Sequence, residues 1–257
     1  MEGKIPVIDA HQIEEKSIKL REIIEKWGCF RVINHGVPLK LMAEMKSVSK
    51  ELLDLPIEIK RRNVDVIPGS GEIIESYARA TYKAAIDIAS KMSMSLGLTD
   101  YSFEGWPLQF RINKYSFTPE VIGSSGVQIH TDSGFLTILQ DDENLGGLEV
   151  MNESGEFVAA DPLPGTLVVN LGDVAVPWSN GILRNVQHRV QCKGAGIRMS
   201  IATFLSPPPD KIIEAPAEFV DAEHPRLYAP ITYEEFKEAS QFKEAACRRS
   251  PRPNSTR

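Results

Sequence analysis

Three residues in the second half of the chain have the chemistry of metal ligands. His130 and Asp132 lie in the run Gln-Ile-His-Thr-Asp-Ser-Gly, and His188 lies in Val-Gln-His-Arg-Val. Two neutral imidazoles and one carboxylate bind non-haem Fe(II) on one face of an octahedron, which leaves three positions open for a cosubstrate and oxygen. A site closed by four protein ligands would leave none. The sequence therefore predicts that His130, Asp132 and His188 are catalytic iron ligands.

A candidate carboxylate-binding pair follows in the run Arg-Met-Ser, at Arg198 and Ser200. Residues i and i+2 of a strand point to the same face, so these two side chains lie next to each other if the segment is extended. A planar guanidinium beside a hydroxyl suits bidentate binding of a carboxylate better than an ammonium does. We therefore expect a carboxylate cosubstrate to bind here, next to the metal.

Strands must bring these residues together. The run Gly134-Phe-Leu-Thr-Ile-Leu139 is rich in β-formers, so we expect His130 and Asp132 at the start of a strand with both side chains on one face. His188 lies far along the chain and must be returned by the fold. The turn signal Ser179-Asn-Gly181 predicts a hairpin, with residues 184–191 as its returning strand.

The length and pattern of the chain predict one domain over residues 1–257, mainly β with flanking helices (α+β). Between Leu108 and Phe204, short β-rich segments divided by Gly, Asn, Asp and Pro turns predict a double-stranded β-helix (jelly-roll) barrel of about eight strands. We expect a mostly helical region at 1–100, the jelly-roll core at 101–210 and a C-terminal extension at 211–257. Before the barrel, apolar periodicity predicts two strands, at 5–9 and 27–34, and three helices, at 12–27, 38–55 and 72–96.

Composition excludes several classes of partner. The net charge is −6, the pI is about 5.5 and the longest basic run is Lys60-Arg-Arg62, which argues against a nucleic-acid or anionic-membrane surface. No stretch reaches the roughly 18 apolar residues of a membrane span, and the first residues lack an apolar secretory core, so we expect a cytoplasmic protein. The three cysteines have no paired or metal-ligand spacing and are expected to be reduced. His11, His35 and His224 have no ligand partner at i+2 and are expected to play no part in metal binding.

The chain resembles the plant 2-oxoglutarate- and Fe(II)-dependent dioxygenases over nearly its whole length. Beyond the His/Asp/His set and Arg198-Met-Ser200, the resemblance rests on four runs: Ile5-Pro-Val-Ile-Asp9, Trp27-Gly-Cys-Phe-Arg-Val-Ile-Asn-His-Gly-Val37, Asn113-Lys-Tyr115 and Trp178-Ser-Asn-Gly181. Within that superfamily it is most similar to the dioxygenases for auxin oxidation. That similarity is carried by Gly105-Trp-Pro-Leu-Gln-Phe-Arg-Ile-Asn-Lys-Tyr115, His130-Thr-Asp-Ser-Gly-Phe-Leu-Thr-Ile-Leu-Gln140 and Glu218-Phe-Val-Asp-Ala-Glu-His-Pro-Arg-Leu-Tyr228.

The resemblance implies a role for each matched residue. His130, Asp132 and His188 would hold Fe(II), and Arg198, Ser200 and Tyr115 would bind the distal carboxylate of 2-oxoglutarate. Asn113 shares a strand face with Tyr115 and would line the same pocket. The family consumes O2 and 2-oxoglutarate, with ascorbate as a supporting reductant. A second copy of the chain, in a homodimer, is a further expected partner.

The resemblance also implies a substrate, indole-3-acetic acid, oxidised to 2-oxindole-3-acetic acid in auxin catabolism. Such a ligand needs an apolar slot and a cation for its carboxylate. Arg111 alternates onto the face of Asn113 and Tyr115 and is the candidate cation, although a structural arginine at the barrel mouth fits the sequence equally well. Phe135 and Phe204 are candidate aromatic walls, with ordinary core positions as the alternative for both.

One segment departs from the family. Its members carry a few tens of residues between a turn like Ile67-Pro-Gly-Ser-Gly71 and the helix that begins here near Glu72, and this piece contributes part of the substrate pocket and its lid. The shortening leaves two alternatives to an auxin dioxygenase. One is a catalytically impaired variant that acts as a binding or dimerising partner, and the other is a dioxygenase of another small acid such as a gibberellin.

Overall fold

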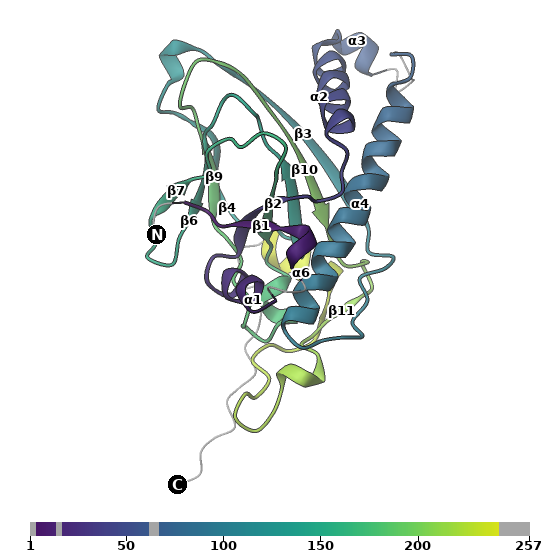
Figure 1. The fold of residues 1–257 in the computed structure, drawn as a ribbon, viewed down its shortest axis with the longest axis vertical. Coiled ribbons are helices and arrows are strands. Elements are labelled where there is room, and N and C mark those ends of the chain that lie inside the picture. The colour runs from purple at the N-terminus through teal and green to yellow at the C-terminus, as the bar shows by residue number, and fades with distance from the viewer. Residues whose placement is uncertain (1–3, 14–16, 62–66, 242–257) are drawn as a thin grey trace.

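A computed structural model describes residues 4–13, 17–61 and 67–241 and shows two facing sheets with helices against the larger one (Figure 1). The six-stranded sheet has the order β1-β2-β8-β5-β10-β3, the four-stranded sheet has the order β4-β9-β6-β7, and β11 pairs with β12. The strands are β1 (Val7–Asp9), β2 (Cys29–Ile33), β3 (Leu108–Phe117), β4 (Ser125–His130), β5 (Leu136–Gln140), β6 (Leu148–Met151), β7 (Phe157–Ala159), β8 (Leu167–Leu171), β9 (His188–Gln191), β10 (Gly196–Leu205), β11 (Ile212–Ile213) and β12 (Ile231–Thr232).

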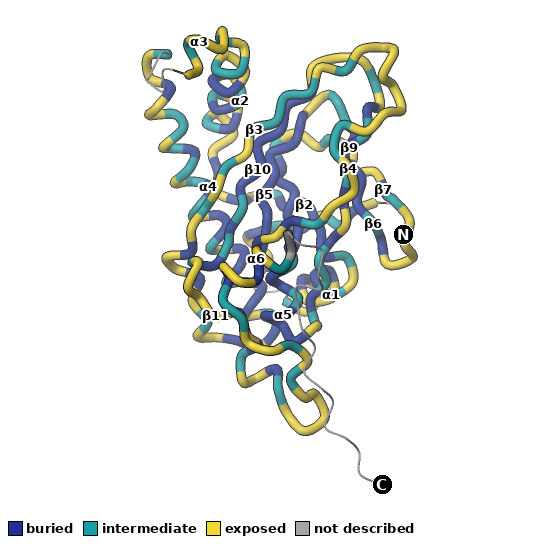
Figure 2. The backbone as a smooth tube through the Cα atoms, turned by 180° about the vertical axis from the view of Figure 1, so that it is seen from behind, coloured by how far each residue is buried: buried dark blue, intermediate teal, exposed yellow. Residues whose placement is uncertain are grey.

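The eight strands β3 to β10 are the predicted jelly roll, so this fold prediction is confirmed. Strands β5 and β8 are buried along their whole length because helices cover one side of the large sheet and the small sheet faces the other. The long strands β3 and β10 pair antiparallel from Leu108↔Leu205 to Phe117↔Gly196. In Figure 2, β4 is largely exposed whereas β5 and β10 are mostly buried.

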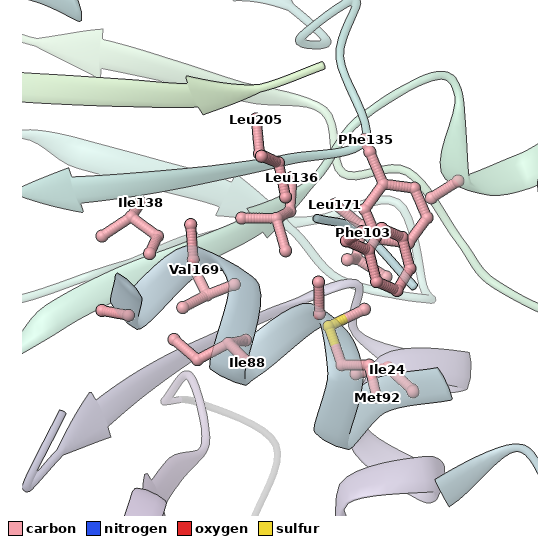
Figure 3. Packing of buried hydrophobic residues seen from close by; sticks show 14 of the residues in the cluster. Ile24, Ile88, Met92, Phe103, Phe135, Leu136, Ile138, Val169, Leu171 and Leu205 are labelled. Carbon is pink, nitrogen blue, oxygen red and sulfur yellow. The ribbon is translucent and has the colours of Figure 1, made fainter. Parts of the chain in front are cut away.

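Six α-helices are described: α1 (Ser17–Lys26), α2 (Leu39–Asp54), α3 (Ile57–Lys60), α4 (Ser70–Ser95), α5 (Ala175–Trp178) and α6 (Tyr233–Gln241). Helix α4 lies across the large sheet and buries Ile88 and Met92 beside Ile138, Val169 and Leu171 (Figure 3). Each such aliphatic side chain stabilises the fold by about 1.5–3 kcal/mol when it leaves water. The helix begins just after Gly69, with φ 78°, and ends before Gly97, with φ 93°. The predicted stop at Gly97 is confirmed.

The predicted hairpin at residues 179–181 is wrong. These residues end the short helix α5, and the strands on either side, β8 and β9, belong to different sheets. The turn signal itself was real, since Asn180 and Gly181 have φ 55° and 86°. The Asn180 side chain donates to the carbonyl of Phe219 at 3.0 Å and accepts from the amide of Leu227 at 2.8 Å. It therefore fixes the C-terminal segment instead of turning a strand back.

The helix expected over 12–27 is described only as α1, after a 3-10 turn at Ala10–Gln12, and residues 14–16 lie outside the described ranges. Strands β1 and β2 join the large sheet through β8, so the mostly helical N-terminal region also forms one edge of that sheet. Single-domain organisation with the limits given above stays a prediction. None of the described helices is both long enough and apolar enough to cross a membrane. The tail beyond Gln241, with Cys247, lies outside the described residues.

Candidate metal and cosubstrate site

His130 and His188 meet as a cross-strand pair at the end of β4 and the beginning of β9, with ring centroids 4.2 Å apart. Asp132 lies in the loop between β4 and β5, so the prediction that it shares a strand face with His130 is wrong. The three residues nevertheless converge. Oδ1 of Asp132 is 3.7 Å from Nε2 of His130 and 3.8 Å from Nε2 of His188. Within the described ranges, this is the one cluster of His, Cys or acidic side chains with metal-ligand geometry, and the other three histidines stand apart from it.

Backbone carbonyls orient both imidazoles. Nδ1 of His130 lies 2.8 Å from the carbonyl oxygen of Gln128, and Nδ1 of His188 lies 3.2 Å from that of Val186. An N–H on each Nδ1 donates to its carbonyl, which leaves the Nε2 lone pairs directed at the cluster. Burial also lowers the pKa of His188, which favours the neutral ring that a metal requires.

Asp132, the carboxylate ligand, is held through both its side chain and its backbone. The hydroxyl of Thr137 donates to Oδ2 of Asp132 at 2.5 Å and leaves Oδ1 free for a metal. The backbone oxygen of Asp132 accepts from the amide of Asp173 at 2.7 Å. Gly172 permits this contact, since a Cβ there would lie 2.7 Å from the oxygen of Asp132 and 2.2 Å from that of Gly134. Two free Nε2 atoms and one free carboxylate oxygen fit a Fe(II) ion with open positions for other ligands.

Arg198 is fully buried and two of its donors lack partners. Its Nη2 pairs with Asp141, whereas Nε and Nη1 have no hydrogen-bond partner among the described residues. Register places Tyr115 opposite Arg198 and Asn113 opposite Ser200, and the Arg198 guanidinium lies 5.2 Å from the centre of the Tyr115 ring. Buried donors without partners are costly, so an anionic ligand is expected to complete them. The arrangement fits one carboxylate of 2-oxoglutarate.

The hydroxyl groups beside Arg198 complete the same subsite. Asn113 Nδ2 lies 3.5 Å from the hydroxyl oxygen of Ser200. Burial raises the pKa of Tyr115, so its phenol keeps the proton that it would donate to a carboxylate. The sequence-based grouping of Arg198, Ser200, Tyr115 and Asn113 therefore agrees with their positions.

A cavity of about 910 Å³ connects the metal ligands to the Arg198 subsite between the two sheets. Arg111 and Phe204 line it, as expected of candidate substrate contacts. Phe135 does not agree with that expectation, since it is fully buried and its ring centre lies 4.8 Å from that of Phe103 and 5.0 Å from that of Trp178. It is a core residue just before β5, and its ring packs among the buried aromatic rings of Phe103, Trp106 and Trp178.

Sequence reasoning missed many lining residues of this cavity, among them the polar side chains of Asn170, Tyr233 and Lys237. Tyr233 and Lys237 lie on α6, and the sequence at the start of this helix contains a helix-capping signal. Thr232 and Glu235 form a capping box, in which the Thr232 amide donates to the Glu235 carboxylate at 3.0 Å and the Glu235 amide donates to the Thr232 hydroxyl at 3.3 Å. Asn170 had no local signal, because it reaches the cavity only through the position of its strand, β8, between β2 and β5.

Comparison with known proteins identifies the family. Residues 106–207 match the model of the 2OG-Fe(II) oxygenase superfamily, and residues 5–95 match that of the non-haem dioxygenase N-terminal region, described from morphine synthesis. The 2-oxoglutarate-dependent dioxygenase DAO of Oryza sativa subsp. indica is 44% identical over 279 residues, covering 91% of this chain and 93% of the relative. The chain belongs to the 2-oxoglutarate/Fe(II)-dependent dioxygenases.

Solved structures of this dioxygenase family agree with the fold and the site. The crystal structure of the dioxygenase for auxin oxidation in rice has a TM-score of 0.87 at 44% identity, covering 93% of this chain and 95% of that one. The Arabidopsis thaliana dioxygenase for auxin oxidation 1, in a binary complex with 2-oxoglutarate, has a TM-score of 0.80 at 50% identity, covering 86% and 100%. The alignment with the curated rice relative is 279 residues long, more than this whole chain of 257, so the chain lacks residues that the relative has.

Proposed function

We propose that this dioxygenase oxidises indole-3-acetic acid to 2-oxindole-3-acetic acid, with 2-oxoglutarate and O2 as cosubstrates. Two relatives named for auxin oxidation, at 44% and 50% identity, support this substrate. The observation that carries the proposal is the fully buried Arg198, whose Nε and Nη1 have no partner among the described residues, in one cavity with the three metal ligands. At about 910 Å³ the cavity is at the upper end of the usual range for small-molecule sites, which leaves room for a second small acid beside 2-oxoglutarate.

The residues of the chain supply binding, orientation and exclusion of water. Fe(II), when held by His130, Asp132 and His188, supplies the activation of O2 that is coupled to decarboxylation of 2-oxoglutarate. Arg198 binds the distal carboxylate through its free Nε and Nη1, so the other end of 2-oxoglutarate is directed toward the metal ligands. Apolar side chains of both sheets line the cavity around the reacting groups and exclude water from them: Leu139, Leu148, Val190 and Ala202.

Three further features belong to the proposal. Ascorbate would keep the iron reduced, a homodimer is the proposed assembly, and the proposed location is the cytoplasm. The location is supported by the free, buried thiols of Cys29 and Cys192, which suit a reducing compartment, and by the acidic net charge.

An oxygen-pulse experiment tests the activity. The protein is loaded anaerobically with Fe(II) and 2-oxoglutarate, oxygen is added, and succinate is measured with and without indole-3-acetic acid. Succinate formation stimulated by the acid, with a product heavier by one oxygen atom, is expected. Binding of iron and 2-oxoglutarate without stimulation would contradict the proposal and leave the two alternatives, the impaired variant and a dioxygenase of another small acid such as a gibberellin.

A further inference from the structure

Two cations besides Arg198 line the cavity, and neither has an acidic partner. Lys237 comes from α6 and Arg111 from β3. Among the residues that the structure describes, no carboxylate oxygen lies within 4.0 Å of either group. Lys237 is half-buried, whereas Arg111 is exposed on an edge strand. An ammonium that lines a cavity without a counter-ion favours an anion at that point.

The helix that carries Lys237 is fixed in several ways. Tyr233 and Phe236 are buried in the core, at 6% and 2% exposure. The amide of Tyr233 donates to the carbonyl of Lys211, and that of Glu234 to the carbonyl of Pro209, both at 3.0 Å. The ammonium of Lys237 lies 4.8 Å from the centre of the Tyr233 ring, a cation–π contact that restrains it. The position of this charge is therefore set before any ligand binds.

Strand register orders the subsites along β10. Arg198 lies near its beginning, and the strand continues through Ser200 and Phe204 to the loop that contacts α6. Thr137, which holds Asp132, pairs with Phe204 and so lies beyond Ser200 on the side away from Arg198. The metal ligands are thus displaced from Arg198 in the direction of α6. Lys237 is at the end of the cavity that 2-oxoglutarate leaves free.

We propose that Lys237 binds the carboxylate of the organic-acid substrate, from the side of the metal opposite to Arg198. This inference rests on the proposed function, which supplies a small carboxylic acid as the substrate. Lys237 suits this role better than Arg111, because its ammonium is restrained against Tyr233 and the residue is half-buried, whereas Arg111 is exposed. Arg198 would then hold the cosubstrate and Lys237 the substrate, so that two acids of similar chemistry are kept in separate halves of one cavity.

Binding of an acid and its neutral amide tests the proposal. Indole-3-acetic acid and indole-3-acetamide are titrated by calorimetry into the anaerobic full-length protein loaded with Fe(II) and 2-oxoglutarate. Lys237→Met is expected to weaken binding of the acid about 10-fold to 100-fold, the strength of one charge-assisted hydrogen bond, and to leave binding of the amide unchanged. Lys237→Arg should restore most of the affinity. Lys40→Met, at an exposed lysine of α2, is the matched control and should change neither.

The inference would be overturned if Lys237→Met and wild type bound the acid with equal affinity, or if Lys237→Met lost affinity equally for the acid and the amide. It would also be overturned if only Arg111→Met lost affinity for the acid, or if wild type did not bind the acid. Failure of the proposed function looks different. Binding of the acid that depends on Lys237, but without an oxygenated product after oxygen is added, would refute oxidation of this acid and leave the assignment of Lys237 in place.

Discussion

Asp141 lies between two buried arginines and determines how one of them is presented to a ligand. It pairs with Nη2 of Arg198, and its Oδ2 lies 3.8 Å from Nη2 of Arg31. Arg31 in turn donates to the carbonyls of Ala160 at 3.1 Å and Asp161 at 2.5 Å. Burial raises the pKa of Asp141, and the charge of Arg198 opposes that rise. Asp141 is therefore a positioning residue that directs the two free donors of Arg198 into the cavity.

Asp141→Asn should weaken binding of 2-oxoglutarate at least 10-fold, because the guanidinium loses the charge that orients it. Breaking a buried pair also costs about 3–5 kcal/mol of stability, so urea unfolding is measured beside an anaerobic 2-oxoglutarate titration. Asp161→Asn is the matched control, since Arg31 bonds the backbone of Asp161 and not its carboxylate. Lower stability with unchanged 2-oxoglutarate affinity would refute the positioning role.

Arg198→Ala should raise the 2-oxoglutarate requirement about 10²–10⁴-fold, since two charge-assisted hydrogen bonds of about 1.5–3 kcal/mol each are lost. Iron should still bind, because none of its ligands contacts Arg198 through a hydrogen bond or ion pair among the described residues. Equilibrium dialysis with Fe(II) and a 2-oxoglutarate titration measure the two affinities separately. Loss of iron in this variant, with the fold intact by circular dichroism, would contradict the assigned role.

At the residue scale, the sequence predicts the groups that touch ligands better than the groups that orient them. His130, Asp132, His188 and Arg198 were found because their order and side-chain chemistry are specific. Asp141 was missed because an acidic residue in a polar run has no local mark of burial between two arginines. For Phe135 the sequence left open a cavity wall or a core position, because only the three-dimensional packing distinguishes the two.

At the element scale, the loop that carries Asp132 depends on close approach of the turn after β8. Gly172→Ala should therefore disrupt the metal site, because its Cβ would lie 2.2 Å from the backbone oxygen of Gly134. Fe(II) affinity measured by dialysis should fall at least 10-fold, since displaced ligands lose their common geometry. Gly194→Ala is the control, because its nearest contact would be an ordinary 3.4 Å from Leu145. Full iron binding by Gly172→Ala would show that the loop adapts.

The turn between β2 and α2 should make stability depend on pH. His35 is buried, its Nδ1 accepts from the amide of Val37 at 3.2 Å, and its Nε2 donates to the carbonyl of Gly165 at 3.3 Å. Both bonds suit a neutral ring. Burial lowers the pKa of His35 in the folded state, whereas the unfolded chain takes up the proton near pH 6.5. Its contribution to stability is therefore complete above that pH and is lost as the pH falls below it.

His35→Asn should flatten the dependence of the unfolding free energy on pH between about 7 and 5, where the unfolded chain binds the proton and the folded chain resists it. Urea unfolding at a series of pH values measures the slope. His11→Asn, at an exposed histidine, serves as control. A slope unchanged in His35→Asn would mean that other groups determine the acid sensitivity.

Long periodic elements were predicted well and short ones poorly. Helices α2 and α4 were found because their apolar stripes run over many turns and proline or glycine marks their ends. The turn at residues 179–181 was misassigned, because positive φ values serve the end of a helix as well as a hairpin. Helix α6 is only 9 residues long, and its capping box was the one local signal for it.

At the scale of the whole molecule, one core joins both ends of the described chain. A single cluster of buried residues contains Ile8, Ile24, Met92, Phe135 and Phe236, from β1, α1, α4, the start of the barrel and α6. Neither terminal region therefore has a core of its own. The chain should unfold in one cooperative step in urea, with fluorescence and circular dichroism giving coincident midpoints. Two separated transitions would instead divide the N-terminal region from the jelly roll.

Arg198 is fully buried, whereas the side chain of His130 is 39% exposed and Lys237 is half-buried. We therefore expect a molecule that arrives from solvent to pass the metal ligands before it reaches the guanidinium. An acid already bound near α6 would obstruct that path. Steady-state kinetics should thus be ordered, with 2-oxoglutarate entering before the second acid and succinate departing after the oxygenated product. Excess second acid should accordingly inhibit by trapping the enzyme before its cosubstrate has entered.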